Sequence, residues 1–250
     1  LRAGALVFDN DYRHPAILGK ELATMDVLSD GRVEIGLGAG WMRTDYDQLG
    51  LDYDRAGVRV DRFVEGLAVI RGVMGPGPFN FSGEHYQISD YDGLPKPAQA
   101  PCPPILIGGG GPRVLRIAAH EADIVGINGT LSAGEFGDAA FATMTLDAVT
   151  DKVDIVAEAA GDRIADIELN IRTFFNKVTD DRGAAVGRIA RAVGVDEAKL
   201  ETSPFALIGS HSGIVEDLLA LREQFGSSYV IVGANEIDSF APVVAQLAGH

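Results

Sequence analysis

Cysteine is almost absent from this 250-residue sequence, which contains Cys102 and no second thiol with which it could form a disulfide. A chain without disulfides fits a reducing compartment, and the first residues lack the pattern of a secretory signal peptide. No apolar run approaches the ~18–20 residues that a membrane-spanning helix needs. We therefore expect a cytoplasmic protein that does not use a membrane as its partner.

Positive charge is also scarce. The chain has 21 Lys and Arg against 36 Asp and Glu, which gives a formal net charge of −15. Nucleic acids and anionic membrane surfaces attract basic patches, so this charge excludes both as expected partners. Any anionic ligand has to be held locally, by backbone N–H groups and a few arginines.

Several catalytic motifs are missing. The five histidines show no paired spacing and there is no cysteine cluster, so the sequence predicts no metal site. No Gly-x-Ser-x-Gly turn is present, which argues against an α/β-hydrolase nucleophile. No Gly-Lys-Ser/Thr follows the one run of four glycines, so that run is not a Walker loop.

Apolar residues make up 46% of the chain, enough for a substantial core. Short apolar runs alternate with helical patterns, which indicates parallel strands joined by helices. Six parallel strands fit a doubly wound sheet, and they also fit an eight-stranded barrel that has two more strands. The predicted strands are residues 3–8, 33–38, 105–107, 122–127, 168–174 and 229–232, and residues 42–56 and 128–137 are predicted polar loops, the second one mobile.

The helices are marked by their apolar spacing and by capping residues. Val60, Phe63, Leu67, Ile70 and Met74 recur at steps of three and four, which predicts a core-facing helix. Further helices are expected over 146–160, after the polar residues 179–181, after Ser212 as a cap, and at the end of the chain.

We predict one domain over residues 1–250, with an insertion at about 75–103. The insertion is rich in proline and contains a predicted small hairpin around Ser82 and Gly83. A long insertion inside a compact domain is more often functional than accidental.

The residues around 105–113 predict a strand, a bare loop and the start of a helix. Ile105 begins the strand, Gly108, Gly109, Gly110 and Gly111 form the loop, and Pro112 stands at the first helical position. The N–H groups and positive dipole end of such a helix form a site for a phosphate. A tight turn that merely requires glycine explains the same residues, and the two interpretations are about equally weighted.

Other candidates lie in the loops after strands, where barrel enzymes place their active sites. His14 fits a loop-ordering role better than a catalytic one, since geometry decides such cases. Trp41 either packs under its loop or walls a cofactor ring. Arg13, Arg43 and Arg113 stand at loop–helix junctions, where they are the obvious charge partners for an anion or are simply solvated.

Several linked segments resemble the luciferase-like monooxygenase superfamily, and they are most similar to its branch that is assigned to coenzyme F420. They are Leu-Val at 6–7 through Arg-His-Pro at 13–15, Glu-Leu-Ala-Thr-Met-Asp-Val-Leu-Ser-Asp-Gly-Arg at 21–32, Gly-Leu-Gly-Ala-Gly-Trp at 36–41, the Lys-Pro to Gly-Gly-Gly-Gly stretch ending at 111, Ala-Asp-Ile-Val-Gly at 122–126, and residues 212–232.

This resemblance implies a (β/α)8 TIM barrel of the bacterial luciferase type, with the cofactor at the carboxyl ends of the strands. It implies that the first strand here is the family's third, so that the first two β/α units are lacking and the natural protein is longer. A non-proline cis peptide bond that supports the cofactor ring is then expected within residues 5–8. The implied cofactor-binding residues are Leu6, Val7, Phe8, Gly38, Ala39, Gly40, Trp41, Gly108, Gly109, Gly110, Gly111 and Arg113.

The expected function is an oxidoreductase that transfers a hydride between F420 and a small organic substrate, since the coenzyme carries the chemistry in such enzymes. One alternative is an FMN-dependent monooxygenase, and another is a non-catalytic flavin-binding homologue. In F420 enzymes of the superfamily, a histidine or tryptophan from the loop after the second strand often lies at the active centre. No position here matches it, which leaves His14 as a weak catalytic candidate. The resemblance also implies a homodimer.

Overall fold

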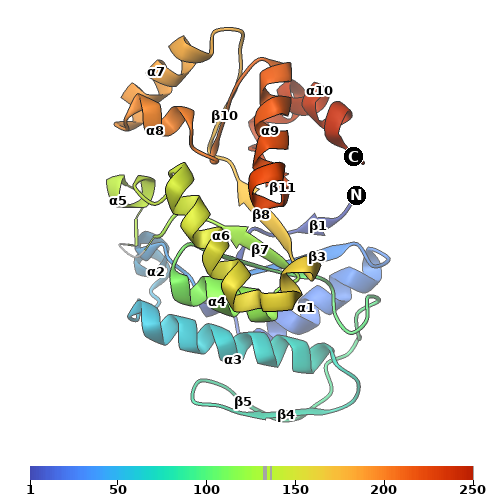
Figure 1. Ribbon diagram of the computed structural model, residues 1–250. Helices are drawn as coiled ribbons and strands as arrows, with labels where there is room; N and C mark the ends of the chain where they lie inside the picture. The colour runs from blue at the N-terminus through green and yellow to red at the C-terminus, as the bar shows by residue number, and fades with distance from the viewer. Residues whose placement is uncertain (132–133, 136, 250) are drawn as a thin grey trace. The chain divides into compact units, whose positions relative to one another are not determined.

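The computed structural model describes residues 1–131, 134–135 and 137–249 (Figure 1). The predicted mobile loop over 128–137 therefore falls partly outside the described residues. The chain divides into two compact units, and each is described by itself. The first unit comprises Leu1–Gly108 with His120–Ile124, and the second comprises Gly109–Ala119 with Val125–His250.

Strand β3 (Val33–Gly38) is the centre of the first unit, and all six of its residues are buried. It pairs in parallel with β1 (Ala3–Gly4) and β2 (Phe8–Asp9) on one side. On its other side it pairs in parallel with β6 (Ile105–Gly109). A strand buried on both faces needs an apolar or glycine residue at nearly every position, as the sequence of β3 provides.

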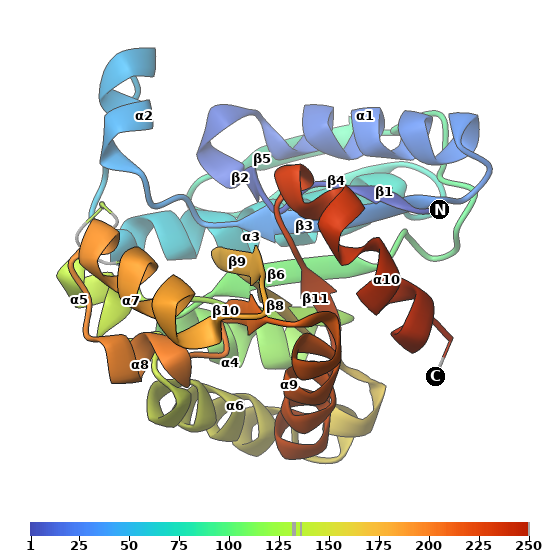
Figure 2. The same cartoon turned by 90° about the horizontal axis from the view of Figure 1, so that it is seen from above.

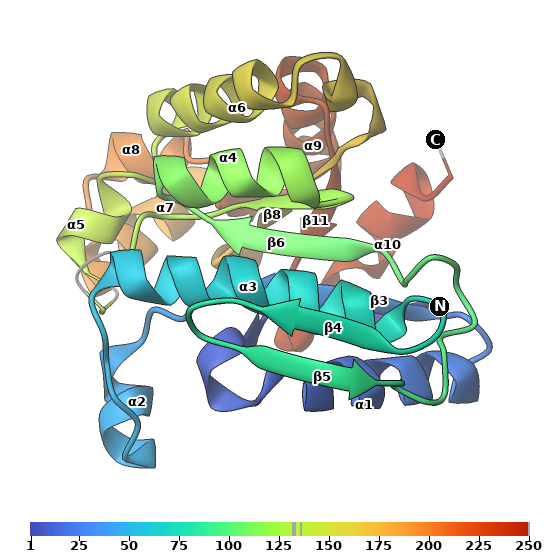
Figure 3. The same ribbon diagram turned by 90° about the horizontal axis from the view of Figure 1, so that it is seen from below.

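Two helices and a hairpin cover this part of the sheet. Helix α1 (Pro15–Leu28) opens on a proline, and α3 (Ala56–Met74) buries the whole predicted apolar stripe. The hairpin of β4 (Phe79–Ser82) and β5 (Gln87–Tyr91) is antiparallel, as predicted. Figure 3 shows it lying across α1 and α3, and its Ile88 packs with Ala16 of α1 and Val69 and Val73 of α3.

Two expectations for this unit are wrong. The predicted strand over 3–8 is two short pieces, β1 and β2, because the backbone leaves the sheet between them. The predicted loop over 42–56 contains a helix, α2 (Arg43–Leu49). Its sequence is polar and only Tyr46 of it is buried, so no apolar periodicity marks it. A 3-10 turn (Asn10–Tyr12) follows β2.

The second unit holds two parallel strand pairs. Strand β8 (Glu168–Arg172) pairs with β11 (Ser227–Ile231), and β9 (Phe175–Val178) pairs with β10 (Ala206–Gly209). The side chains of β10 alternate between two clusters, as strand geometry requires. Ala206 and Ile208 join the cluster of α7 and α8, whereas Leu207 joins that of α9 and α10. Figures 1 and 2 both show α7 and α8 on one side of β10 and α9 on the other.

The remaining elements belong wholly or mostly to this unit. They are α4 (Pro112–Glu121), β7 (Ile124–Ile127), α5 (Asp138–Phe141), α6 (Leu146–Ala160), α7 (Arg182–Val193), α8 (Glu197–Glu201), α9 (His211–Phe225) and α10 (Ile237–Leu247), with 3-10 turns at Gly161–Asp166 and Ala234–Glu236.

Three expectations for this unit also need correction. The count of six strands misses β9 and β10, since no turn signal separates β9 clearly from β8 and the short apolar run of β10 was not assigned to a strand. The small helices α5 and α8 were not expected either. The cap of α9 is Ser210 rather than Ser212, because the Ser210 hydroxyl accepts the N–H of Gly213 at 3.2 Å. The cap of α7 is Asp181, as predicted.

Among the described residues, no helix combines the length and the apolar character that crossing a bilayer demands.

Candidate functional site

Val7 in the first unit is seated against glycines of two neighbouring strands. A Cβ atom built on Gly38 would lie 2.7 Å from Val7 Cγ2, closer than real Cβ contacts allow. A Cβ on Gly36 would lie 3.3 Å from Val7 Cγ1, and one on Gly108 would make an ordinary contact at 3.5 Å. The bare ends of β3 and β6 therefore make room for the Val7 side chain.

The peptide bond between Leu6 and Val7 is cis, which confirms the expectation for residues 5–8. It lies between β1 and β2, immediately before Phe8. Leu6 is 39% exposed, and Val7 and Phe8 are half-buried. Phe8 is aligned with Leu37 in the sheet. Of these three predicted residues, Val7 is thus brought against the predicted Gly38, and Phe8 pairs with the residue before it.

Gly40 is the second constrained glycine of this region. Its φ is +75°, and a Cβ there would lie 1.9 Å from the hydroxyl of Tyr46 and 2.6 Å from an oxygen of Asp9. Glycine is needed for both the conformation and the space. The next residue, Trp41, is half-buried, and its carbonyl accepts the hydroxyl of Tyr53 at 2.9 Å. Ala39 to Trp41 therefore pass close to polar side chains.

Those polar side chains form a network. The Tyr46 hydroxyl lies 2.9 Å from Asp11 Oδ2 and 3.2 Å from both oxygens of Asp9. The Arg62 guanidinium donates two hydrogen bonds to the Asp11 carboxylate, at 2.7 and 2.9 Å, and a third to Asp54 at 2.9 Å. Paired, forked contacts of this kind fix side-chain geometry strongly.

The network shifts the pKa values of its members. Burial, and then the neighbouring Asp11 charge, raise the pKa of Asp9 above its usual value, although a backbone N–H opposes them. Burial and the two carboxylates raise the pKa of Tyr46, so this phenol stays protonated and acts as a donor. No motif in the sequence marks Tyr46 or Arg62, and the two tyrosines of the polar segment, Tyr46 and Tyr53, are the one signal available.

The glycine loop belongs mostly to the second unit, from Gly109 to Pro112 at the start of α4. A Cβ on Gly110 would lie 2.3 Å from the carbonyl oxygen of Gly129 and 2.5 Å from that of Asn128. A Cβ on Gly109 would lie 2.5 Å from Val114, whereas one on Gly111 would meet nothing within 4 Å. Tight packing thus explains Gly109 and Gly110, but it does not explain Gly111.

The loop is held by its neighbour, residues 128–130. Thr130 donates its hydroxyl to the Gly110 carbonyl at 2.9 Å, and Asn128 donates its N–H to Gly109 at 3.0 Å. The N–H of Thr130 is bound in turn by the hydroxyl of Thr143 at 2.8 Å. The glycine loop is therefore fixed in place by hydrogen bonds.

Lys152 of α6 donates a hydrogen bond to the segment of residues 128–130 that holds the glycine loop. It is 5% exposed, and its ammonium donates to the carbonyl of Asn128 at 2.8 Å and to that of Thr143. Burial lowers the pKa of Lys152 to about 8. A buried lysine is uncommon, and nothing in the sequence pattern of α6 singled it out.

The remaining candidates lie at the surface of their elements. His14 is exposed and caps α1, since its Nδ1 accepts the N–H of Ala16 at 3.3 Å, and its ring packs edge-on against Tyr86. Arg13 pairs with Glu21, and Arg43 pairs with Asp47. Arg113 is exposed in the first turn of α4. The structure thus shows His14 capping α1, and a catalytic role for it stays a prediction.

The chemistry of these groups suits an anion rather than a metal. Among the described residues, no group of three His, Cys, Asp or Glu side chains could hold a metal ion. The start of α4 supplies backbone N–H groups and a positive dipole end, with Arg113 in the same turn. The open side of Gly111 lets a phosphate approach that backbone, so the residues of the second unit fit the phosphate of a flavin or deazaflavin.

Comparisons with known proteins show the family of this chain. The luciferase-like monooxygenase family matches residues 2–205, so the chain belongs to that family. It is 31% identical over 118 residues to an FMNH(2)-dependent dimethylsulfone monooxygenase from Pseudomonas putida. The aligned residues cover 46% of this chain and 32% of that protein. It is 28% identical over 183 residues to an F420-dependent glucose-6-phosphate dehydrogenase from Amycolatopsis mediterranei. The aligned residues cover 73% of this chain and 51% of that protein.

A solved structure has the same α/β fold. The coenzyme F420 dependent tetrahydromethanopterin reductase from Methanopyrus kandleri superposes with a TM-score of 0.78 at 20% identity, over 99% of this chain and 82% of that one. The chain therefore has the α/β fold of the luciferase-like proteins. Its sequence matches span between about a third and a half of the length of the two curated relatives described above.

Proposed function

We propose that this protein is an oxidoreductase that transfers a hydride between coenzyme F420 and a small organic substrate. The observation that carries the proposal is the open space beside the backbone of Gly111 at the start of α4. The loop is fixed there because the Thr130 hydroxyl donates a hydrogen bond to the carbonyl of the preceding residue, Gly110. It offers an anionic cofactor a local site in a chain whose net charge is −15. Among the relatives described, the F420-dependent dehydrogenase matches the larger share of the chain, 73%.

Each part of the site then has a defined task. In the second unit, Gly109, Gly110, Gly111 and Arg113 hold the phosphate. In the first unit, Gly38, Ala39, Gly40, Trp41 and Gly108 are the cofactor-binding residues at and after the ends of β3 and β6. Leu6, Val7 and Phe8 support the ring. When bound, the deazaflavin supplies the hydride chemistry, and the protein binds, orients and excludes water.

An FMN-dependent monooxygenase is the second candidate. It is favoured by the 31% identity to the FMNH(2)-dependent dimethylsulfone monooxygenase. FMN also has a phosphate and a tricyclic ring, so the same residues would hold it. A flavin-binding protein without catalysis is the third. Under the main proposal, β1 and β2 correspond to the third strand of the eight-stranded barrel, and the protein acts as a homodimer in the cytoplasm.

A fluorescence titration with F420 and, separately, with FMN tests the proposal. We expect F420 to bind at least tenfold more tightly than FMN. Gly111→Asp and Gly111→Asn are the matched variants, because both side chains enter open space and differ only in charge. A carboxylate beside a phosphate should weaken F420 binding by roughly tenfold or more relative to the asparagine variant.

The outcomes separate the candidates. Tighter binding of FMN, with oxygen consumption by the reduced form, would establish the monooxygenase instead. Binding without turnover of any substrate would favour the non-catalytic homologue. If the aspartate and asparagine variants bind F420 equally, the glycine loop is a structural turn and does not hold the phosphate.

A further inference from the structure

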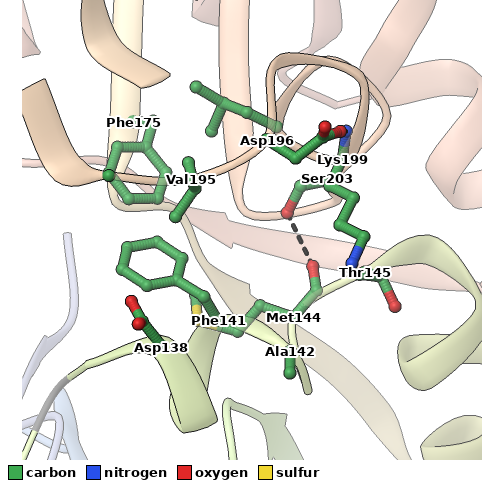
Figure 4. A pocket seen from close by; sticks show the side chains of 12 residues that line it. Asp138, Phe141, Ala142, Met144, Thr145, Phe175, Val195, Asp196, Lys199 and Ser203 are labelled. Carbon is green, nitrogen blue, oxygen red and sulfur yellow. Dashed lines mark hydrogen bonds between the residues drawn. The ribbon is translucent and has the colours of Figure 1, made fainter. Parts of the chain in front are cut away.

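The second unit contains a pocket whose lining residues belong neither to the polar network nor to the glycine loop. Its volume is about 150 Å³, and it opens between the segment that joins α5 to α6 and the segment that leads from α7 through α8 (Figure 4). Strand β9 closes its back. The lining side chains include Phe141, Met144, Phe175, Val195 and Leu200.

The walls are apolar and well packed. The rings of Phe141 and Phe175 stack with centroids 5.6 Å apart and an interplanar angle of 27°. Leu200, with Phe175 and Val195 packed beside it, belongs to the hydrophobic cluster between β10 and the helices α7 and α8. Because these residues are part of a core, the pocket is preformed and does not depend on a ligand for its shape.

Three polar side chains of the lining are engaged with the protein's own backbone. Ser203 donates its hydroxyl to the carbonyl of Met144 at 2.7 Å, and Figure 4 shows this bond across the pocket. Thr145 caps α6 by accepting the N–H of Ala148, and Asp196 caps α8 by accepting the N–H of Lys199. What remains for a ligand is therefore mainly apolar contact.

The volume limits the occupant. An apolar protein cavity of about 150 Å³ accommodates one benzene molecule. A ring of six atoms or an aliphatic chain of similar length fits, and a sugar would lose its hydrogen bonds to water without recovering them here. The lining carries two acidic residues, Asp138 and Asp196, and one basic residue, Lys199, so it offers no net attraction to an anionic ligand.

The pocket is connected to the glycine loop by a short chain of contacts. Met144 lies in its wall, and a Cβ on Gly129 would be only 3.1 Å from the Cγ and the sulfur of Met144. Gly129 in turn presents its carbonyl to Gly110 of the glycine loop. One residue therefore separates the pocket wall from the proposed cofactor loop.

We propose that this pocket binds a small, uncharged and mostly apolar molecule, a monocyclic ring or a chain of about six carbons, and that this molecule is the substrate. The assignment as a substrate site rests on the proposed function, whereas the ligand site itself does not. The proposal excludes a sugar phosphate as the substrate.

The first experiment uses the protein without cofactor. Benzyl alcohol is titrated while the methyl signals of the four methionines are followed by NMR. We expect the Met144 signal to shift in a saturable way, with a dissociation constant of about 0.1–1 mM, or −4 to −5.5 kcal/mol. The exposed Met25 of α1 is the internal control and stays unchanged. Glucose, a polar six-membered ring, should leave both signals unchanged.

A variant locates the site. Ala142→Trp places an indole at the mouth, where Ala142 is exposed, and should weaken benzyl alcohol binding at least fivefold. Ala192→Trp, on the exposed surface of α7 and outside the lining, should have no effect. If the NMR signals of Met25 and Met144 shift equally, or if Ala142→Trp leaves benzyl alcohol binding intact, the proposal that this pocket binds a ligand is overturned.

The second experiment tests the substrate assignment. With the cofactor and a substrate that turns over, Ala142→Trp should raise KM at least fivefold and leave the dissociation constant of the cofactor unchanged. An unchanged KM overturns the substrate assignment. If neither cofactor binds, the proposed function fails, whereas the benzyl alcohol titration still decides whether the pocket is a ligand site.

Discussion

Val7 shows how one side chain constrains residues distant in sequence. Its two methyl groups occupy the space that Cβ atoms would take at Gly36 and Gly38, about thirty positions later. The two glycines differ in what a side chain would meet. At Gly38 the obstacle is the Val7 side chain, whereas at Gly36 it is the backbone oxygen of Ala5, 1.7 Å away. A side chain can be removed by mutation and a backbone oxygen cannot.

The first prediction uses that difference. Gly38→Ala should destabilise the protein by about 1–3 kcal/mol through overpacking. In the background of Val7→Ala the same change should cost at least about 1 kcal/mol less, because the opposing methyl group is gone. Chemical denaturation of the single and double variants measures both values.

Gly36→Ala is the matched control for this cycle. Its cost should persist in the Val7→Ala background, because the Ala5 carbonyl remains. Additive effects of Gly38→Ala and Val7→Ala would show that Val7 does not determine the requirement for glycine at position 38.

At the scale of elements, a single carboxylate of α3 binds the turn of the β4–β5 hairpin. Glu65 accepts the N–H groups of Glu84, His85 and Tyr86 at 2.8, 2.9 and 3.1 Å. Burial raises the pKa of Glu65, but these three N–H bonds outweigh it, and the net shift is downward. The turn of the hairpin is therefore fixed by an acceptor on another element.

We predict that Glu65→Gln loosens this turn without unfolding the protein. The amide has one acceptor oxygen and no charge, so the amide protons of residues 84–86 should exchange roughly tenfold faster, which corresponds to about 1.4 kcal/mol. Hydrogen exchange followed by NMR or mass spectrometry measures the effect. Glu84→Gln, on the exposed side chain of the same turn, should leave exchange unchanged. Unaltered exchange in Glu65→Gln would sink this account of the hairpin.

At the scale of the whole molecule, stability should depend on pH through Lys152. Its folded-state pKa is lowered to about 8 by burial, whereas a lysine in the unfolded chain titrates near 10.4. Between these values the unfolded state binds more protons than the folded state, so stability rises with pH. The protonated form at neutral pH therefore opposes folding, although its hydrogen bonds hold residues 128 and 143.

The prediction is a gain of up to about 3 kcal/mol in the free energy of unfolding between pH 8 and 10.4. Lys152→Met should lack this gain, as chemical denaturation across the pH range would reveal. Direct NMR titration of the Lys152 side chain gives an answer that does not require the variant to fold. A pKa above about 10 in the folded protein would contradict the prediction.

Local patterns predicted much of this molecule. The apolar spacing of residues 60–74 predicted α3, because a helix of 3.6 residues per turn gathers those side chains on one face. The apolar run at 33–38 predicted β3, and Pro112 and Asp181 marked helix starts. Elements with weak patterns were missed: α2 is polar, and β9 and β10 have four residues each.

The sequence by itself determined the alternation of strands and helices, the bare glycine loops and the family, since these depend on neighbouring residues and on motif order. Only the tertiary structure decided which distant groups meet. The contacts of Val7 with Gly38, of Glu65 with the turn at 84–86, and of Lys152 with Asn128 join separate elements. So does the pocket between residues 138–145 and 194–203. Such contacts follow from how the elements pack, and no local propensity encodes that packing.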